Sequence, residues 1–146
     1  MKVKKDITDF VTEKLKEQFG IDEPELRFYE GGKGKIYTYK YKLPEFLKKY
    51  LVQSGIYFGR IEKDGVRLSI DGSSLVGKKA DACRVELNDV EAINWMSGRD
   101  IKKDSKTKCC YILLKWRSFF VGCGKLFREN EELKIKNFVP KNRRVR

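Results

Sequence analysis

The pattern of apolar positions predicts one amphipathic helix at the start of the chain. Apolar side chains recur every three or four residues and so share one helical face: Ile7, Phe10, Val11, Leu15 and Phe19. Asp6 or Thr8 can cap the first turn, and Gly20 can end the helix in a left-handed conformation. We therefore expect a helix of about four turns before Gly20.

A first hairpin is predicted after this helix. Residues 26–29 and 35–41 are rich in aromatic and β-branched side chains, and Gly31-Gly-Lys-Gly34 between them has turn chemistry. Tyrosines alternate with polar residues along the second run, so they share one strand face, which we expect to be core or interface. Pro44 can then open a short helix over residues 45–51, because a first-turn residue needs no N–H.

A second hairpin and a helical turn come next. Residues 56–61 and 66–70 are strand-like and flank Asp64-Gly65, a dipeptide that strongly favours a tight turn between antiparallel strands. Residues 71–77 predict a short helical turn, with Asp71 as its cap.

The rest of the chain alternates strands with a single helix. The predicted strands are residues 83–87, 109–116, 119–127 and 133–136. Asn88 and Glu91 have the spacing of a capping box, so a helix begins there, and Gly98 ends it. Arg117-Ser118 forms the turn of a third hairpin.

These elements predict an α+β fold. Several short strands with tight turns and one helix among them favour a partly closed, mixed β-barrel over a sandwich. We expect this barrel over residues 53–146 and an N-terminal α/β portion (helix, hairpin, short helix) over residues 1–52.

Composition adds a preference for an anionic partner. The chain has 146 residues, of which 40% are apolar and 37% charged, enough for a core and a well-solvated surface. Its formal net charge is +12, which favours binding to nucleic acid, although charge alone also suits a membrane surface. No apolar stretch reaches the length of a spanning helix and no signal-peptide core follows Met1, so we expect a soluble, cytoplasmic protein and no membrane partner.

The residue types make metal and catalytic chemistry hard to assign. Histidine is absent, and the cysteines (Cys83, Cys109, Cys110 and Cys123) form no CxxC pair. We expect free thiols, no metal and no cofactor. Without histidine, the commonest general base is missing, so we predict that the protein is not an enzyme.

The C-terminal residues carry the strongest functional signal. From residue 134 to the end there are six cations and no acid: Lys134, Lys136, Lys141, Arg143, Arg144 and Arg146. Clustered charge of this kind suits a polyanion, although a frayed, solubilising terminus is the alternative interpretation.

Three more residues near the end of the chain join the predicted RNA-binding set. Phe138 could stack on a base or anchor the segment into the barrel, and Asn137 could bond a base edge or shape the turn. Lys125 follows two glycines that let a phosphate approach closely, or that merely curve a strand carrying an ordinary solvated lysine.

The order of four motifs resembles a known RNA-binding domain. The motifs are residues 59–75 (GRIEKDGVRLSIDGSSL), 90–101 (VEAINWMSGRDI), 122–125 (GCGK) and 136–144 (KNFVPKNRR). They look like the C-terminal PUA-like domain of Sun-type rRNA cytosine-C5 methyltransferases. The resemblance implies a PUA-like barrel that binds RNA. Cys123 departs from the pattern, since the family usually has an aromatic residue there.

The resemblance does not extend to the methyltransferase domain. There is no Gly-rich nucleotide loop after a strand and too little chain for a Rossmann-like domain, so we expect no site for S-adenosylmethionine. The catalytic cysteines of those enzymes belong to that domain, and the cysteines of this chain inherit no role from them.

Three hypotheses follow. The first is a stand-alone, non-catalytic protein that binds structured rRNA or tRNA in RNA modification or ribosome biogenesis, such as a detached specificity subunit working with an RNA-modifying enzyme. The second is a protein-interaction adaptor in ribosome assembly. The third is an enzyme or a regulatory subunit with a reactive cysteine, Cys110 or Cys123.

Overall fold

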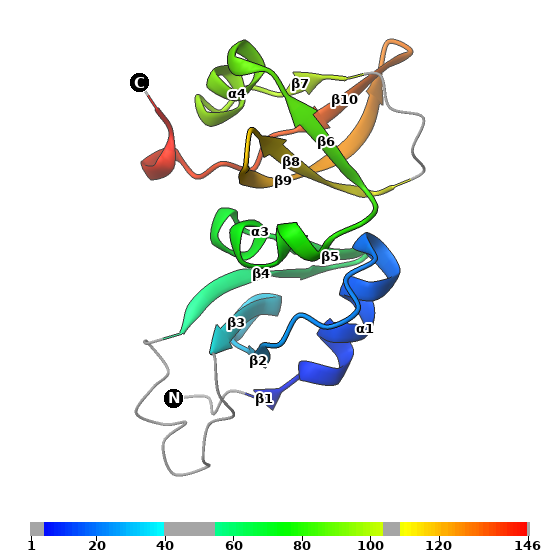
Figure 1. Ribbon diagram of the computed structural model, residues 1–146, viewed down its shortest axis with the longest axis vertical. Helices are drawn as coiled ribbons and strands as arrows, with labels where there is room; N and C mark the ends of the chain where they lie inside the picture. The colour runs from blue at the N-terminus through cyan, green and yellow to red at the C-terminus, as the bar shows by residue number, and fades with distance from the viewer. Residues whose placement is uncertain (1–4, 40–54, 104–108, 146) are drawn as a thin grey trace.

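The computed structural model describes residues 5–39, 55–103 and 109–145, which form two five-stranded sheets with helices around them (Figure 1). The first sheet has the order β1 (Lys5–Asp6), β2 (Arg27–Glu30), β3 (Lys35–Tyr39), β4 (Ile56–Glu62) and β5 (Gly65–Leu68). The second has the order β6 (Arg84–Leu87), β8 (Tyr111–Trp116), β9 (Phe119–Glu129), β10 (Glu132–Lys136) and β7 (Ile101–Lys102).

The helices are α1 (Thr8–Phe19), α3 (Ile70–Val76) and α4 (Asp89–Met96), with 3-10 turns η1 (Gly32–Gly34), η2 (Gly77–Lys79) and η3 (Lys141–Arg143). α3 lies between the two sheets, α1 lies beside the first and α4 beside the second (Figure 1). The second sheet curls into a half-barrel, and its one parallel pair, β6 with β8, makes it mixed. The predicted α+β class with a partly closed mixed barrel is confirmed.

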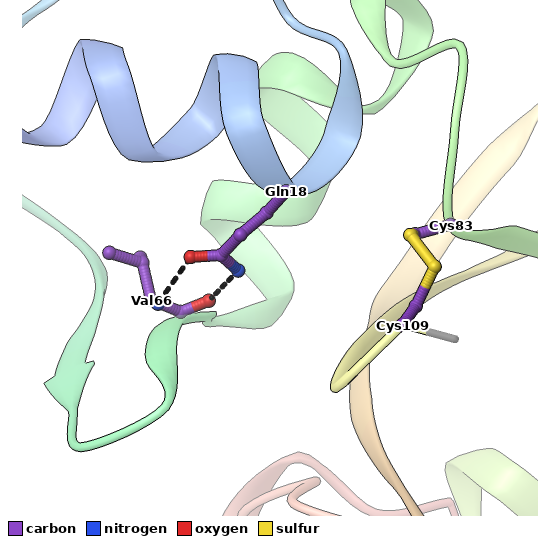
Figure 2. The surroundings of a disulfide bond; sticks show 4 residues. All are labelled: Gln18, Val66, Cys83 and Cys109. Carbon is purple, nitrogen blue, oxygen red and sulfur yellow. Dashed lines mark hydrogen bonds between the residues drawn. A yellow bond between two sulfur atoms is a disulfide. The ribbon is translucent and has the colours of Figure 1, made fainter. Parts of the chain in front are cut away.

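The first helix forms and ends at Gly20 as predicted, but its N-cap residue is Ile7, which makes no side-chain capping hydrogen bond, and not Asp6 or Thr8. The Asp6 carboxylate accepts hydrogen bonds from the Thr8 N–H at 3.0 Å and from the Thr8 hydroxyl at 2.7 Å. Gly20 takes the left-handed conformation (φ 67°) that ends the helix, and its N–H returns to Lys16 O. Val11, Leu15 and Phe19 of the predicted apolar face are fully buried, whereas Phe10 is exposed. Near the C-terminus of the helix, Gln18 bonds both backbone polar groups of Val66 in β5 (Figure 2).

Both hairpins of the first sheet form as predicted, and the tyrosine face of β3 is packed but only partly buried. In β3 the fully buried side chains are Ile36 and Thr38, whereas Tyr37 and Tyr39 are half-buried on the opposite face. Tyr37 packs against Tyr57 of β4 with ring centroids 5.9 Å apart. The fully buried face of β3 is therefore formed by Ile36 and Thr38, which alternate with the tyrosines.

The helix after β5 is capped by Ser69 and not by Asp71. The Ser69 hydroxyl accepts from the Gly72 N–H at 2.9 Å, which makes Ile70 the first helical residue. Asp71 lies inside the first turn, free to meet a partner elsewhere. Ser69 and Asp71 are both residue types that commonly cap helices, and they are two positions apart. The fold uses Ser69 as the cap.

The predicted capping box is confirmed in α4, where the Asn88 side chain accepts from the Glu91 N–H at 2.8 Å and the Glu91 carboxylate accepts from the Asn88 N–H at 3.0 Å. The third hairpin and the closing strand also form as predicted. Within the third hairpin, the β8–β9 register shifts at Val121. The Val121 carbonyl accepts a hydrogen bond from Trp95 Nε1 at 3.0 Å. The irregularity thus fixes the largest side chain of the barrel core.

Strand β8 joins the first sheet to the second sheet, because its side chains are buried in two different cores. Its residues alternate between two cores: Tyr111 and Leu113 pack with α1 and the first sheet, whereas Ile112 and Leu114 pack inside the second sheet with Trp95 and Ile135. All four are almost fully buried. A strand buried on both faces reads as a continuous apolar run, as this one does.

The expectation of free thiols is wrong for two cysteines. Cys83 and Cys109 form a disulfide that ties the start of β6 to the segment before β8 (Figure 2). The pairing joins residues 26 apart in sequence. Cys110 and Cys123 are free.

Two predictions fall outside the described residues. The short helix over residues 45–51 lies there, and so does the expected division between residues 52 and 53, which stays a prediction. Among the described residues, β4 and β5 extend the first sheet, so the change of sheet comes after β5.

Candidate nucleic-acid interface

The C-terminal segment, residues 137–145, is held against the barrel at several points. Asn137 anchors its start: the side-chain amide donates to Trp95 O at 2.7 Å and to Arg99 O at 2.9 Å, and its oxygen accepts from the Val139 N–H at 2.7 Å. The Asn137 N–H donates to the Asp100 carboxylate at 2.8 Å. Since every polar group of the side chain is engaged, Asn137 joins the segment to α4 and the loop after it.

The segment is fixed beyond Asn137 as well. Val139 is buried in the core of the second sheet. Arg144 Nε donates to Val139 O at 3.1 Å, and the guanidinium fills the space beside Gly98, where a Cβ would collide with it. The Val145 N–H donates to Met96 O at 2.9 Å. The alternative of a frayed terminus therefore does not describe residues 137–145.

Two cations lie over the aromatic ring of Phe138. The guanidinium carbon of Arg67, from β5, lies 4.2 Å from the ring centroid, and Lys136 Nζ lies 5.5 Å from it. Contacts at these distances are attractive because the face of an aromatic ring carries partial negative charge. Arg67 also donates to Glu62 at 3.2 Å. An aromatic plane is thus fixed among positive charges that come from both sheets.

The remaining cations of the segment lie around η3. Lys141 and Arg143 are exposed, and Arg143 donates to both oxygens of Asp71 at 3.3 and 3.4 Å. Both side chains of that pair are about half exposed, so the ion pair stabilises the fold by little and can exchange partners. Arg146 lies outside the described residues.

Lys125 and Lys134 point to carboxylates. Lys125 Nζ lies 2.7 Å from Asp64, which also accepts from the Tyr111 hydroxyl at 2.6 Å. Hydrogen bonds from Lys125 and Tyr111 lower the pKa of Asp64. Lys134 pairs with Glu129 at 3.1 Å. Each of these lysines would have to share its ammonium to bind a phosphate.

The two glycines before Lys125 admit protein atoms. A Cβ on Gly122 or Gly124 would meet the Trp95 ring, and one on Gly124 would also meet Ile135. The close approach that these glycines allow is therefore used by the barrel core.

A pocket of about 190 Å³ opens between the two sheets next to the C-terminal segment. We call it the inter-sheet pocket. Its walls are Tyr57, Arg67 and Asp71 from the first half of the chain and Trp95, Phe138 and Arg143 from the second. It brings together two of the predicted residues, Phe138 and Arg143, with others that sequence reasoning missed, among them Tyr57, Arg67, Asp71 and Trp95. Tyr57, Arg67 and Asp71 carry no local signal for binding, because only the packing of the two sheets places them beside the tail.

The free thiols differ in environment. Cys123 is buried, and burial raises its pKa to about 12. A thiolate is therefore scarce there at neutral pH, which argues against Cys123 as the reactive group. Cys110 is exposed.

No helix in the described parts of the chain combines the length and the apolar character needed to cross a membrane.

Comparison with known families matches residues 82–145 to the methyltransferase RsmF PUA domain. The resemblance drawn from the motifs is thereby confirmed for this part of the chain: it is a PUA-like domain of the kind carried by Sun-type methyltransferases, a module associated with RNA binding. The matched residues include the whole second sheet and the C-terminal segment, whereas the first sheet and α3 precede them. No curated protein matches the chain.

Proposed function

We propose that this protein binds structured rRNA or tRNA through its C-terminal segment and acts, without catalysis of its own, in RNA modification or ribosome biogenesis. One observation carries the proposal: the backbone that bears the cations of the segment is held against a folded PUA-like domain. A fixed array loses less conformational entropy on binding than a flexible tail of the same charge, so more of its attraction for phosphate appears as affinity.

The proposed phosphate contacts are Lys136, Lys141, Arg143 and Arg144, with Arg146, Lys134 and Lys125 as further candidates. Lys136 and Lys141 are exposed and have no acidic partner among the described residues. Lys125, Lys134 and Arg143 are paired with carboxylates, so their contribution requires an exchange of partners. Asn137 supports the site by holding the backbone, and we give it no base contact.

Removing charge without removing structure tests the proposal. Truncation after Leu133 would delete most of β10 together with the buried side chains of Ile135 and Val139, so it would test folding instead of binding. The better variant changes three exposed side chains to glutamine: Lys136→Gln, Lys141→Gln and Arg143→Gln. Its matched control changes three exposed lysines of the first half, Lys33, Lys35 and Lys63, to glutamine.

Both variants lose the same formal charge, so only the position of the charge differs. We expect the C-terminal variant to bind structured RNA more weakly and to lower the slope of log affinity against log salt by roughly 2 to 3, at about 0.7 to 0.9 counterions per contact. The control should keep most of the wild-type slope. Equal slopes for the two variants would remove the C-terminal segment from the interface.

A proposed partner is an RNA-modifying enzyme for which this chain supplies RNA binding. Addition of the protein should then increase modification of the shared RNA by the partner, and the C-terminal glutamine variant should not. The enzyme can be sought by purification of the tagged protein in the presence of RNA.

The adaptor hypothesis has one observation in its favour. Val90 and Ile93 lie one turn apart on α4 and are 68% and 62% exposed, so together they present a small apolar surface that a protein partner could cover. A pull-down with and without ribonuclease separates the two functions. Partners that survive ribonuclease and are lost in Ile93→Lys would indicate a protein contact, whereas partners lost with the RNA support direct RNA binding.

A further inference from the structure

We infer that the inter-sheet pocket receives a single unstacked nucleobase from a single-stranded part of the RNA, held against the ring of Phe138 while its phosphates meet the C-terminal cations. The inference rests on the proposed RNA binding and adds to it a defined subsite. This subsite is built by both halves of the chain, and half of its walls lie outside residues 82–145.

The walls offer the surfaces on which proteins hold unpaired bases. Phe138 presents an aromatic ring that is only partly covered, and Tyr57 from β4 presents a second, 37% exposed. The Arg67 guanidinium carbon lies 4.2 Å from the Phe138 centroid, so the pocket also contains a planar cation. Single-stranded RNA is commonly read by stacking on aromatic rings and guanidinium planes.

The size of the pocket limits what can enter it. At about 190 Å³ it is smaller than the roughly 300–1,000 Å³ of pockets that enclose drug-sized ligands, so one small planar group is a suitable occupant. Its inner wall is apolar, with Leu68, Trp95 and Val139 all buried. The rim is polar, because Arg143 can donate and Asp71 can accept hydrogen bonds at the edge of a base.

The charges nearby favour a nucleotide over an uncharged ring. Lys136 Nζ lies 5.5 Å from the Phe138 centroid, and Arg143 lines the pocket mouth. Lys141 is exposed in the 3-10 turn that contains Arg143. A base inside the pocket therefore leaves its phosphates beside cations. Duplex RNA keeps its bases stacked and paired and would meet only those cations.

Two leucine substitutions separate stacking from charge. Phe138→Leu removes the aromatic ring from the pocket and keeps an apolar side chain. Phe10→Leu is its matched control, because Phe10 on α1 is also an exposed aromatic residue, with Lys14 Nζ 5.7 Å from its ring centroid, and it does not line the pocket. Each variant is titrated against a labelled single-stranded oligonucleotide and a labelled RNA duplex at one salt concentration.

We expect Phe138→Leu to bind the single strand roughly tenfold more weakly and the duplex as wild type does, since one stacked base contributes about this factor or more. Phe138→Tyr should keep the affinity for the single strand, and Phe10→Leu should match wild type on both RNAs. Tyr57→Leu serves as a second pocket variant if Phe138→Leu fails to fold. An equal effect of the pocket and control variants on the single strand would overturn the inference.

Tryptophan emission gives an independent readout. Trp116→Phe leaves Trp95, which lines the pocket, as the single tryptophan. Adenosine monophosphate and the single strand should change the emission of Trp95, and the change should be lost with Phe138→Leu. An unchanged emission under saturating single strand would contradict base entry. If the wild type binds neither RNA, the proposed function itself fails; if it binds both RNAs and the pocket variants have no effect, only the subsite fails.

Discussion

The Asn137 side chain holds a cationic C-terminal segment against the folded domain, so that the segment is part of the surface and not a flexible tail. Its amide joins the C-terminal segment to Trp95 O and Arg99 O and turns the chain toward the buried Val139. Because these hydrogen bonds all lie within the protein, Asn137 positions the segment, and we propose no base contact for it. The lysines and arginines on either side can then be presented to solvent.

We predict that Asn137→Ala destabilises the protein by about 1–3 kcal/mol, because it leaves a backbone N–H and two carbonyls of a half-buried site without their partner. Urea denaturation followed by tryptophan emission measures the change. Asn142→Ala is the matched control, since Asn142 is exposed in the same segment. A variant as stable as this control would mean that Asn137 does not hold the segment.

Asp6 gives the fold a defined dependence on pH. Burial alone would raise its pKa, but hydrogen bonds from Thr8 and Arg27 outweigh burial and lower the pKa to about 2. The carboxyl in an unfolded chain titrates near 3.9. A group whose pKa is lowered on folding stabilises the protein above the unfolded value, and the stabilisation is lost as the pH falls toward the folded value.

We therefore expect Asp6→Asn to be less stable than wild type at pH 7, by up to about 2.5 kcal/mol, and the difference to shrink between pH 4 and pH 2. Urea titrations at pH 7, 4 and 2 give the three differences. Asp9→Asn, at an exposed position of the same helix, is the control. A difference that stays constant down to pH 2 would show that the ionised carboxylate is not the stabilising group.

Among the strands and helices, local signals were sufficient wherever a few neighbouring residues decide the structure. The capping box of Asn88 and Glu91, the left-handed Gly20 and the tight turn at Asp64-Gly65 could all be predicted, because each is closed by residues within three or four positions. The continuous apolar run of residues 111–114 likewise indicated a strand. What it could not indicate is which core each face serves.

Pairings between distant segments were beyond sequence reasoning. Nothing near Cys83 or Cys109 distinguishes them from Cys110 and Cys123, and only the parallel alignment of β6 with β8 brings the first two together. The same holds for Arg67, which reaches the ring of Phe138 across two sheets. The sequence was therefore sufficient to predict a charged C-terminal segment at the candidate site. It was not sufficient to predict the pocket, whose walls come from distant parts of the chain.

The disulfide between β6 and the segment before β8 should add measurable stability. Closing a loop between residues 26 apart removes chain entropy from the unfolded state, worth about 3.5 kcal/mol in the loop-closure treatment. We expect a Cys83→Ser, Cys109→Ser variant to have a free energy of unfolding lower than that of wild type by about that amount, and so to unfold at a lower urea concentration. Reduction of the wild type should have the same effect, and Cys110→Ser should have little. If reduction leaves the midpoint unchanged, the bond does not form in solution.

The two sheets share one core, so the molecule should unfold as a single unit. Phe58 of β4 and Phe28 of β2 pack in the same buried cluster as Leu113 and Phe120 of the second sheet. Cores that are continuous in this way normally unfold in one cooperative transition. The inter-sheet pocket depends on that continuity, because its walls come from both sides.

The tryptophans allow a direct test, since Trp95 and Trp116 both lie in the second half of the chain. Phe28→Ala, in the first sheet, should lower the midpoint of tryptophan emission in urea by an amount corresponding to about 3–5 kcal/mol, the usual cost of truncating a buried phenylalanine. Far-ultraviolet circular dichroism should report the same midpoint. If emission keeps its wild-type midpoint while part of the dichroism is lost earlier, the halves unfold separately. In that case the pocket would open with the weaker half, and binding of single-stranded RNA should fail at lower urea than binding of duplex RNA.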